Sequence, residues 1–120
     1  MGAIIHVNTN GSGAGSGTTD HGVRGTLRGL KITLTGTHTA TAVTITEVGG
    51  LGRTILAVTG LSASTVYNPQ APVSESDGAA ITDVTNPFYI NGSRFTATVT
   101  GGPNNTTNAV QVSFNMDTGV

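Results

Sequence analysis

Residues 95–100, Phe-Thr-Ala-Thr-Val-Thr, and residues 110–116, Val-Gln-Val-Ser-Phe-Asn-Met, alternate apolar and polar side chains without a break. An alternation of period two places every second side chain on the same face of a β-strand. The same period runs through Leu30, Ile32 and Leu34, and it returns at Val43 and Ile45 between threonines. These stretches predict strands that bury one face and expose the other to solvent.

A β-hairpin is predicted where residues 88–90, Phe-Tyr-Ile, meet the strand 95–99 across Asn91-Gly92. The Asn-Gly pair favours a two-residue type I′ turn, because both central residues of that turn take positive φ. Phe88 and Ile90 share one face of the predicted strand and Tyr89 lies on the other. The alternation also predicts that Phe95 and Phe114 belong to the core.

The predicted fold is all-β with essentially no helix. No stretch of about ten residues repeats apolar side chains at i, i+3, i+4 and i+7, the spacing that a helix buries. Many short strands joined by Gly- and Asn-rich turns are typical of an antiparallel two-sheet β-sandwich, jelly-roll-like, or of a small barrel. We expect the sandwich. Pro69 and Pro72 predict an irregular or edge segment over residues 67–78, because proline donates no ladder hydrogen bond.

The length of 120 residues fits one domain, in which we distinguish three segments. Residues 1–10 form a strand or arm, residues 11–22 a Gly/Ser-rich tether, and residues 23–120 the β-sandwich domain. The run Gly-Ser-Gly-Ala-Gly-Ser-Gly at 11–17 predicts a flexible, coil-like connection.

The first segment has two equally weighted interpretations. In one, the tether releases an arm that adds a strand to a neighbouring sheet edge, where Ile4, Ile5 and Val7 fill pockets. In the other, the same residues form the first strand of their own sandwich. The segment has neither a basic region nor a long apolar run, so we expect no signal peptide or membrane anchor.

Composition argues against several classes of partner. Only 9% of the residues are charged, against about 25% in ordinary domains, and the formal net charge is −1. Five Lys and Arg residues give no electrostatic footprint for nucleic acid or for an anionic membrane. The chain has no Cys, which removes disulfides, thiolate metal sites and a cysteine nucleophile.

Two groups of side chains contain the residue types of a catalytic or a metal site, but neither has the sequence context that such a site needs. Asp20-His21 with Ser16 contains the residue types of a Ser-His-Asp triad, but the surrounding sequence lacks a nucleophile elbow. His6, His21 and His38 suit a metal ion chemically, yet their spacing carries no local signature. We therefore expect no enzyme, cofactor or metal centre here.

Two further possibilities concern loops and aromatic side chains. The acidic residues Glu75, Asp77 and Asp83 do not match a calcium loop, and Asp77-Gly78 is better interpreted as a turn. A sugar-binding platform needs exposed aromatic faces, which Tyr67 beside Asn68 would supply in part.

The second half of the chain, residues 65–116, resembles small β-sandwich virion proteins of tailed bacteriophages. The resemblance lies in four stretches: 67–73 (Tyr-Asn-Pro-Gln-Ala-Pro-Val), 77–82 (Asp-Gly-Ala-Ala-Ile-Thr), 86–90 (Asn-Pro-Phe-Tyr-Ile) and 94–99 (Arg-Phe-Thr-Ala-Thr-Val). Some proteins of this kind act as cement or decoration proteins on the outside of the capsid.

The resemblance implies a capsid cement or decoration protein, made in the host cytoplasm and located on the virion surface. Its implied partners are the major capsid protein and further copies of itself, as a homotrimer. The residues we expect at the partner surface are Ile4, Ile5, Val7, Tyr67, Asn68 and Pro69. Two alternatives stay open: another virion module, in a tail or fibre head, and a carbohydrate-binding β-sandwich.

Overall fold

The structure is a computed structural model that describes residues 3–49, 51–74 and 80–117, with residues 71–74 and 80–85 described by their backbone alone. The described elements are ten strands and no helix, which confirms the all-β prediction within these ranges. In chain order they are β1 (Ile4–Val7), β2 (Gly15–Thr18), β3 (Val23–Leu34), β4 (Thr41–Val48), β5 (Thr54–Leu61), β6 (Thr65–Tyr67), β7 (Gln70–Ser74), β8 (Ala80–Pro87), β9 (Tyr89–Thr100) and β10 (Val110–Asp117). None of the described segments is a helix able to cross a membrane.

Eight of the strands belong to one antiparallel sheet, which is open rather than closed into a barrel. Its main path runs β1-β10-β3-β9-β4-β5, while β2 pairs with β9 and β6 pairs with β3. The strands β7 and β8 form a separate two-stranded sheet.

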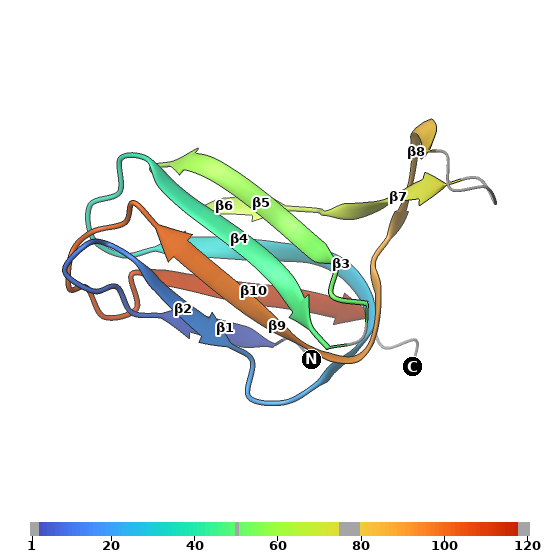
Figure 1. Ribbon diagram of the computed structural model, residues 1–120, viewed down its shortest axis with the longest axis horizontal. Coiled ribbons are helices and arrows are strands. Elements are labelled where there is room, and N and C mark those ends of the chain that lie inside the picture. The colour runs from blue at the N-terminus through green and yellow to red at the C-terminus, as the bar shows by residue number, and fades with distance from the viewer. Residues whose placement is uncertain (1–2, 50, 75–79, 118–120) are drawn as a thin grey trace.

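Two long strands hold the eight-stranded sheet together, because each changes partner along its length. On one edge, β3 pairs first with β9 through residues 23–26 and then with β6 through residues 30–32. The strand β9 begins paired with β3 and continues paired with β2 through residues 96–99. It also pairs with β4 through residues 94–100. In Figure 1, β4, β5 and β9 pass in front of β3 and β10.

The sheet bends back over a single hydrophobic core. Phe95 of β9 and Phe114 of β10 lie on strands that are not ladder neighbours, yet their rings stack with centroids 4.5 Å apart. Both side chains are buried, as the alternation predicted, and Leu30 and Ile32 of β3 join them. The predicted inward positions of β4, β9 and β10 are buried as well: Val43, Ile45, Ala97, Val99, Val110, Val112 and Met116.

The predicted hairpin at Asn91-Gly92 is wrong, because β9 runs straight through these residues. Val23 lies opposite Ser93 while Arg24 lies opposite Asn91, so Gly92 is an extra residue in the ladder, a β-bulge. Its φ of +84° is one that glycine adopts without strain. The bulge shifts the alternation by one residue, so that Ile90 before it and Phe95 after it both reach the core.

The predicted tether is also wrong at residues 15–18, which form β2 and pair with β9 from Gly15↔Val99 to Thr18↔Thr96. The turn before β2 is held by Asn10, whose Oδ1 accepts hydrogen bonds from the amides of Ser12 and Ala14 at 2.9 and 3.1 Å. The glycines in this run therefore belong to ordered structure.

The first segment forms a strand of its own domain, the second of the two interpretations. β1 pairs with β10 from Ile4↔Ser113 to Val7↔Val110. Ile5 and Val7 are buried in the core, whereas Ile4 is 50% exposed on the opposite face. A single arm could not use all three side chains to fill pockets, since consecutive side chains in a strand point to opposite faces.

The β7–β8 hairpin extends away from the body of the molecule at one end (Figure 1). The predicted irregular or edge segment over residues 67–78 takes its edge form at β7, a strand of this two-stranded sheet, and Pro69 lies between β6 and β7. Residues 75–78 lie outside the described residues. The molecule measures 46 × 31 × 22 Å and has a radius of gyration of 14.8 Å, above the roughly 13.6 Å that a compact chain of this length gives.

Candidate binding surface

Among the described residues, the side chains on the outer face of β1, β10, β3 and β6 stand in register. One row across it runs Ile4, Ser113, Lys31, Val66, each directly opposite the next. The two ends of the row are apolar and exposed, Ile4 at 50% and Val66 at 71%. Its centre is a lysine beside a hydroxyl.

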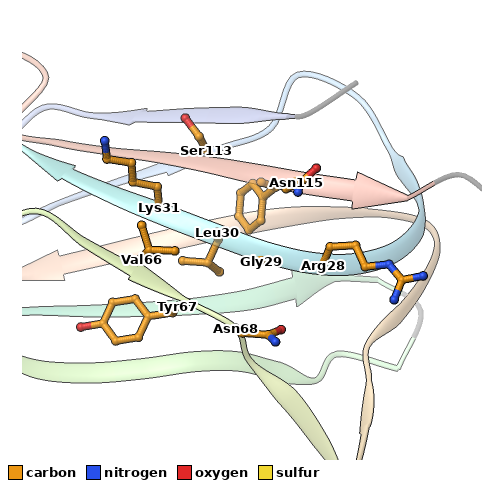
Figure 2. Close-up of a pocket in the computed structure, with 10 residues that line it drawn as sticks. Arg28, Gly29, Leu30, Lys31, Val66, Tyr67, Asn68, Ser113 and Asn115 are labelled. Carbon is orange, nitrogen blue, oxygen red and sulfur yellow. The ribbon is translucent and has the colours of Figure 1, made fainter.

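An open cavity of about 390 Å³ lies on this part of the molecule (Figure 2). Gly29 has no side chain, so the backbone of β3 lines the cavity at this position. The remaining lining residues come from β3, β6, β10 and the residue after β6: Arg28, Leu30, Lys31, Val66, Tyr67, Asn68, Ser113, Phe114 and Asn115. The volume lies within the range of sites that bind small molecules or short peptide segments.

Two cations lie at opposite ends of this cavity in Figure 2. The Arg28 guanidinium donates through Nη2 to Asp117 Oδ2 at 2.9 Å, and both side chains of this ion pair are largely exposed. Lys31 is exposed, and no acidic side chain among the described residues lies in ion-pair contact with its ammonium group. The cavity therefore presents positive charge beside amide and hydroxyl groups.

The predicted partner residues divide between this surface and the interior. Tyr67 and Asn68 line the cavity, and Ile4 stands in the row beside Ser113. Pro69 is buried, so it is not available to a partner, and the prediction for this residue is wrong. Ile5 and Val7 are unavailable for the same reason.

The triad candidates are not brought together as a triad. Ser16 is exposed in β2, and Asp20 and His21 follow in the loop before β3. No hydrogen bond joins these three side chains in the described structure; the Thr19 hydroxyl donates instead to the backbone oxygen of His21 at 3.1 Å.

The three histidines do not converge on a metal site. His6 and His21 line a shallow cavity with Asp20, whereas His38 is buried elsewhere. Across residues 3–49, 51–74 and 80–117, no group of three or more His, Asp or Glu side chains is placed to hold a metal ion. Glu75, Asp77 and the Asp77-Gly78 turn lie outside the described residues, as does the side chain of Asp83.

His38 has a structural role. Its Nε2 lies 3.0 Å from the backbone oxygens of both Thr35 and Ala109, and Nδ1 lies 2.7 Å from Thr41 Oγ1. Because carbonyl oxygens only accept, Nε2 carries the proton, and the ring ties the loop before β4 to the start of β10.

A buried ion pair closes the turn between β4 and β5. Glu47 Oε1 accepts from Arg53 Nε at 2.6 Å, and the Glu47 side chain is only 2% exposed. The Arg53 hydrogen bond holds the pKa of Glu47 below its ordinary value of 4.5, against the opposing effect of burial. The guanidinium also lies over the Phe88 ring, 5.2 Å from its centroid, and donates to the Tyr89 backbone oxygen.

The aromatic side chains do not form a platform. Phe88, Phe95 and Phe114 are buried, Tyr67 is half-buried against the core, and Tyr89 is 58% exposed. No two of them share an exposed sheet face.

One feature that the sequence did not reveal is the open edge of the sheet at β5. This strand of eight residues pairs with β4 and ends the strand order. Its residues, Thr-Ile-Leu-Ala-Val-Thr-Gly-Leu, include no charged side chain, and Ala57 and Thr59 are exposed. A charge-free strand is visible in the sequence, but its place at the sheet edge follows only from the three-dimensional pairing.

Comparison of the chain with protein-family models, curated proteins and solved structures finds no match.

Proposed function

We propose that this chain is a bacteriophage structural protein, a capsid cement or decoration protein that binds the outer surface of the head and stabilises the assembled shell. Its partners are the major capsid protein and further copies of itself, on the virion. The observation that carries the proposal is the open, charge-free edge of β5.

An edge strand presents unpaired backbone amides and carbonyls that accept a strand from another chain. Proteins that do not use such an edge commonly protect it with lysines or other charges, and β5 has none. A cement protein is held by many modest contacts repeated with the symmetry of a shell, and strand addition supplies such contacts. The resemblance of residues 65–116 to phage virion proteins points to the same class.

We further infer that the bent sheet forms the two layers of an antiparallel β-sandwich of jelly-roll type. One layer would contain β1, β10, β3 and β6, and the other β2, the later part of β9, β4 and β5. The stacking of Phe95 on Phe114 supports this division, because the two rings meet across the core.

The carbohydrate-binding alternative receives no support from the aromatic side chains, since Tyr89 alone among the five is largely exposed. A tail or fibre-head module would use the same open edge and differs in the partner it binds. The experiment below therefore includes tails as well as heads.

The edge is tested with the double variant Ala57→Lys/Thr59→Lys, which places two charges on exposed positions of β5. We expect its binding to expanded heads, assembled from the major capsid protein encoded with this chain, to weaken at least about tenfold in co-sedimentation. Purified tails serve as the second binding partner.

Thr98→Lys/Thr100→Lys is the matched control, since it adds the same charge to exposed positions of β9. Thr98 pairs with both β2 and β4, and Thr100 pairs with Ala42 of β4. This control is expected to bind like the unmodified protein. Equal binding by the edge variant would contradict the role of β5, and binding to tails alone would replace the capsid with a tail partner.

A further inference from the structure

Charge is divided unevenly between the β7–β8 hairpin and the rest of the chain. Residues 70–87 contain Glu75, Asp77 and Asp83, three of the six acidic residues, and none of the five Lys and Arg residues. The segment therefore carries a formal charge of −3, and the remaining residues carry +2. Such a division is not visible in the net charge of −1.

In the described structure, β7 and β8 are not part of the eight-stranded sheet. Both β7 and β8 pair only with each other in the described structure, and the ribbon stands off the body (Figure 1). An isolated two-stranded ribbon is marginally stable in water and is stabilised when it packs against a further surface.

A surface of the opposite charge lies at the root of the hairpin. The cavity on β3, β6 and β10 is lined by Arg28 and Lys31, two of the five cations of the chain. Asn68, which also lines it, is two residues before β7 begins at Gln70. In Figure 2 the chain leaves Asn68 in a direction away from the cavity, so the hairpin of one molecule does not cover its own cavity.

We propose that the cavity binds the acidic β7–β8 hairpin of a second copy of this chain. Lys31 supplies a positive charge that no acidic side chain among the described residues compensates, whereas the Arg28 guanidinium is already paired with Asp117. Asn68, Ser113 and Asn115 supply hydrogen-bonding groups for the hairpin backbone. Each copy has both the hairpin and the cavity, so the contact can repeat around a closed ring of copies. This proposal is independent of capsid binding, because it concerns the free protein.

The test is the molar mass of the purified chain, measured by light scattering at ~50 mM and ~500 mM NaCl, since salt screens interactions between exposed charges. At low salt we expect a multiple of the 12.0 kDa monomer mass, and at high salt a shift towards the monomer. A monomer at both salt concentrations would overturn the proposal, including the case in which the hairpin packs on its own body.

Charge-reversal variants locate the contact. Lys31→Glu and, separately, Glu75→Lys/Asp77→Lys are each expected to weaken self-association at least about tenfold, because each places like charges together. The combined variant, with all three changes, is expected to associate again. Arg94→Glu makes the same charge change at an exposed position outside the cavity and should leave the molar mass unchanged.

Failure of the combined variant to associate, or an equal loss in Arg94→Glu, would overturn the hairpin-to-cavity contact. Circular dichroism of every variant checks that the strands are formed. If Lys31→Glu does not fold, the hairpin variant tests the same contact from the other side.

Discussion

Glu47 is a carboxylate taken out of water at the end of β4, where Arg53 compensates its charge with a 2.6 Å hydrogen bond. Removing one partner of a buried ion pair leaves the other charge unpaired, and this is far more costly than loss of an exposed pair. The same two residues are also joined through the backbone, because the Glu47 amide donates to the Arg53 carbonyl oxygen at 2.9 Å.

We expect Arg53→Met, which keeps the apolar stem, to lower the free energy of unfolding by about 3 kcal/mol at neutral pH. Urea denaturation measures this change. Arg28→Met removes the exposed pair with Asp117 and should cost less than about 1 kcal/mol. Equal losses in the two variants would contradict the role assigned to burial at Glu47.

The Glu47–Arg53 ion pair also predicts how the free energy of unfolding depends on pH. The pKa of Glu47 is lowered in the folded state, so its stabilising contribution is complete above its ordinary value of 4.5 and is lost as the pH falls through the lower, folded value. In Arg53→Met this contribution is absent at every pH. The stability difference between the two proteins should therefore shrink as the pH falls below 4.5, and a constant difference would contradict the pairing.

At the scale of single residues, alternation predicted most buried side chains, from Val43 and Ile45 to Phe114 and Met116. Pro69, which was expected at a partner surface and not from alternation, is buried. The partners of His38 and Glu47 were not predictable either, because Thr41, Ala109 and Arg53 come together through the turns and ladders of the folded chain.

At the level of elements, the glycine run 11–17 shows that a missing side chain can allow two strands to approach closely. A Cβ atom on Gly17 would lie 2.5 Å from the His6 backbone oxygen, and one on Gly15 would lie even closer to the Asn8 oxygen. Glycine at these positions lets β2 approach β1 closely, which closes one side of the core.

Gly15→Ala and Gly17→Ala are expected to lower the free energy of unfolding by about 2–4 kcal/mol each, because the backbone oxygens they would contact cannot move away without disturbing the ladders. Gly11→Ala is the control, since its Cβ would meet nothing nearer than 3.9 Å, and its effect should stay within about 0.5 kcal/mol. Thermal unfolding compares the three variants. Similar stability in all three would restore the interpretation of this run as a flexible tether.

The Asn91-Gly92 pair was a strong local signal for a turn, and the surrounding strands overrode it. Local propensity cannot distinguish a turn from a bulge, since both use glycine at positive φ. The distinguishing observation is that Gly22 packs against Gly92 so closely that a Cβ on Gly22 would collide with the Gly92 oxygen. That contact joins two distant segments and is not encoded in the local sequence.

At the scale of the whole molecule, three features point outward: the free edge of β5, the cation-lined cavity and the acidic hairpin. The all-β class and the absence of helix were predictable from periodicity, within the residues the structure describes. The open edge and the cavity were not, because both depend on which strands become neighbours. The proposed contacts with other chains rest on these three features.

Co-sedimentation with expanded capsids gives the stoichiometry of binding, and the thermal stability of the shells is measured on the same samples. A cement protein binds the assembled shell in preference to its subunits, so it stabilises the shell in proportion to occupancy. We expect binding to saturate at a fixed ratio to the major capsid protein, with a shell melting temperature that rises until saturation. Binding that never saturates, or saturation without any change in shell stability, would contradict the account.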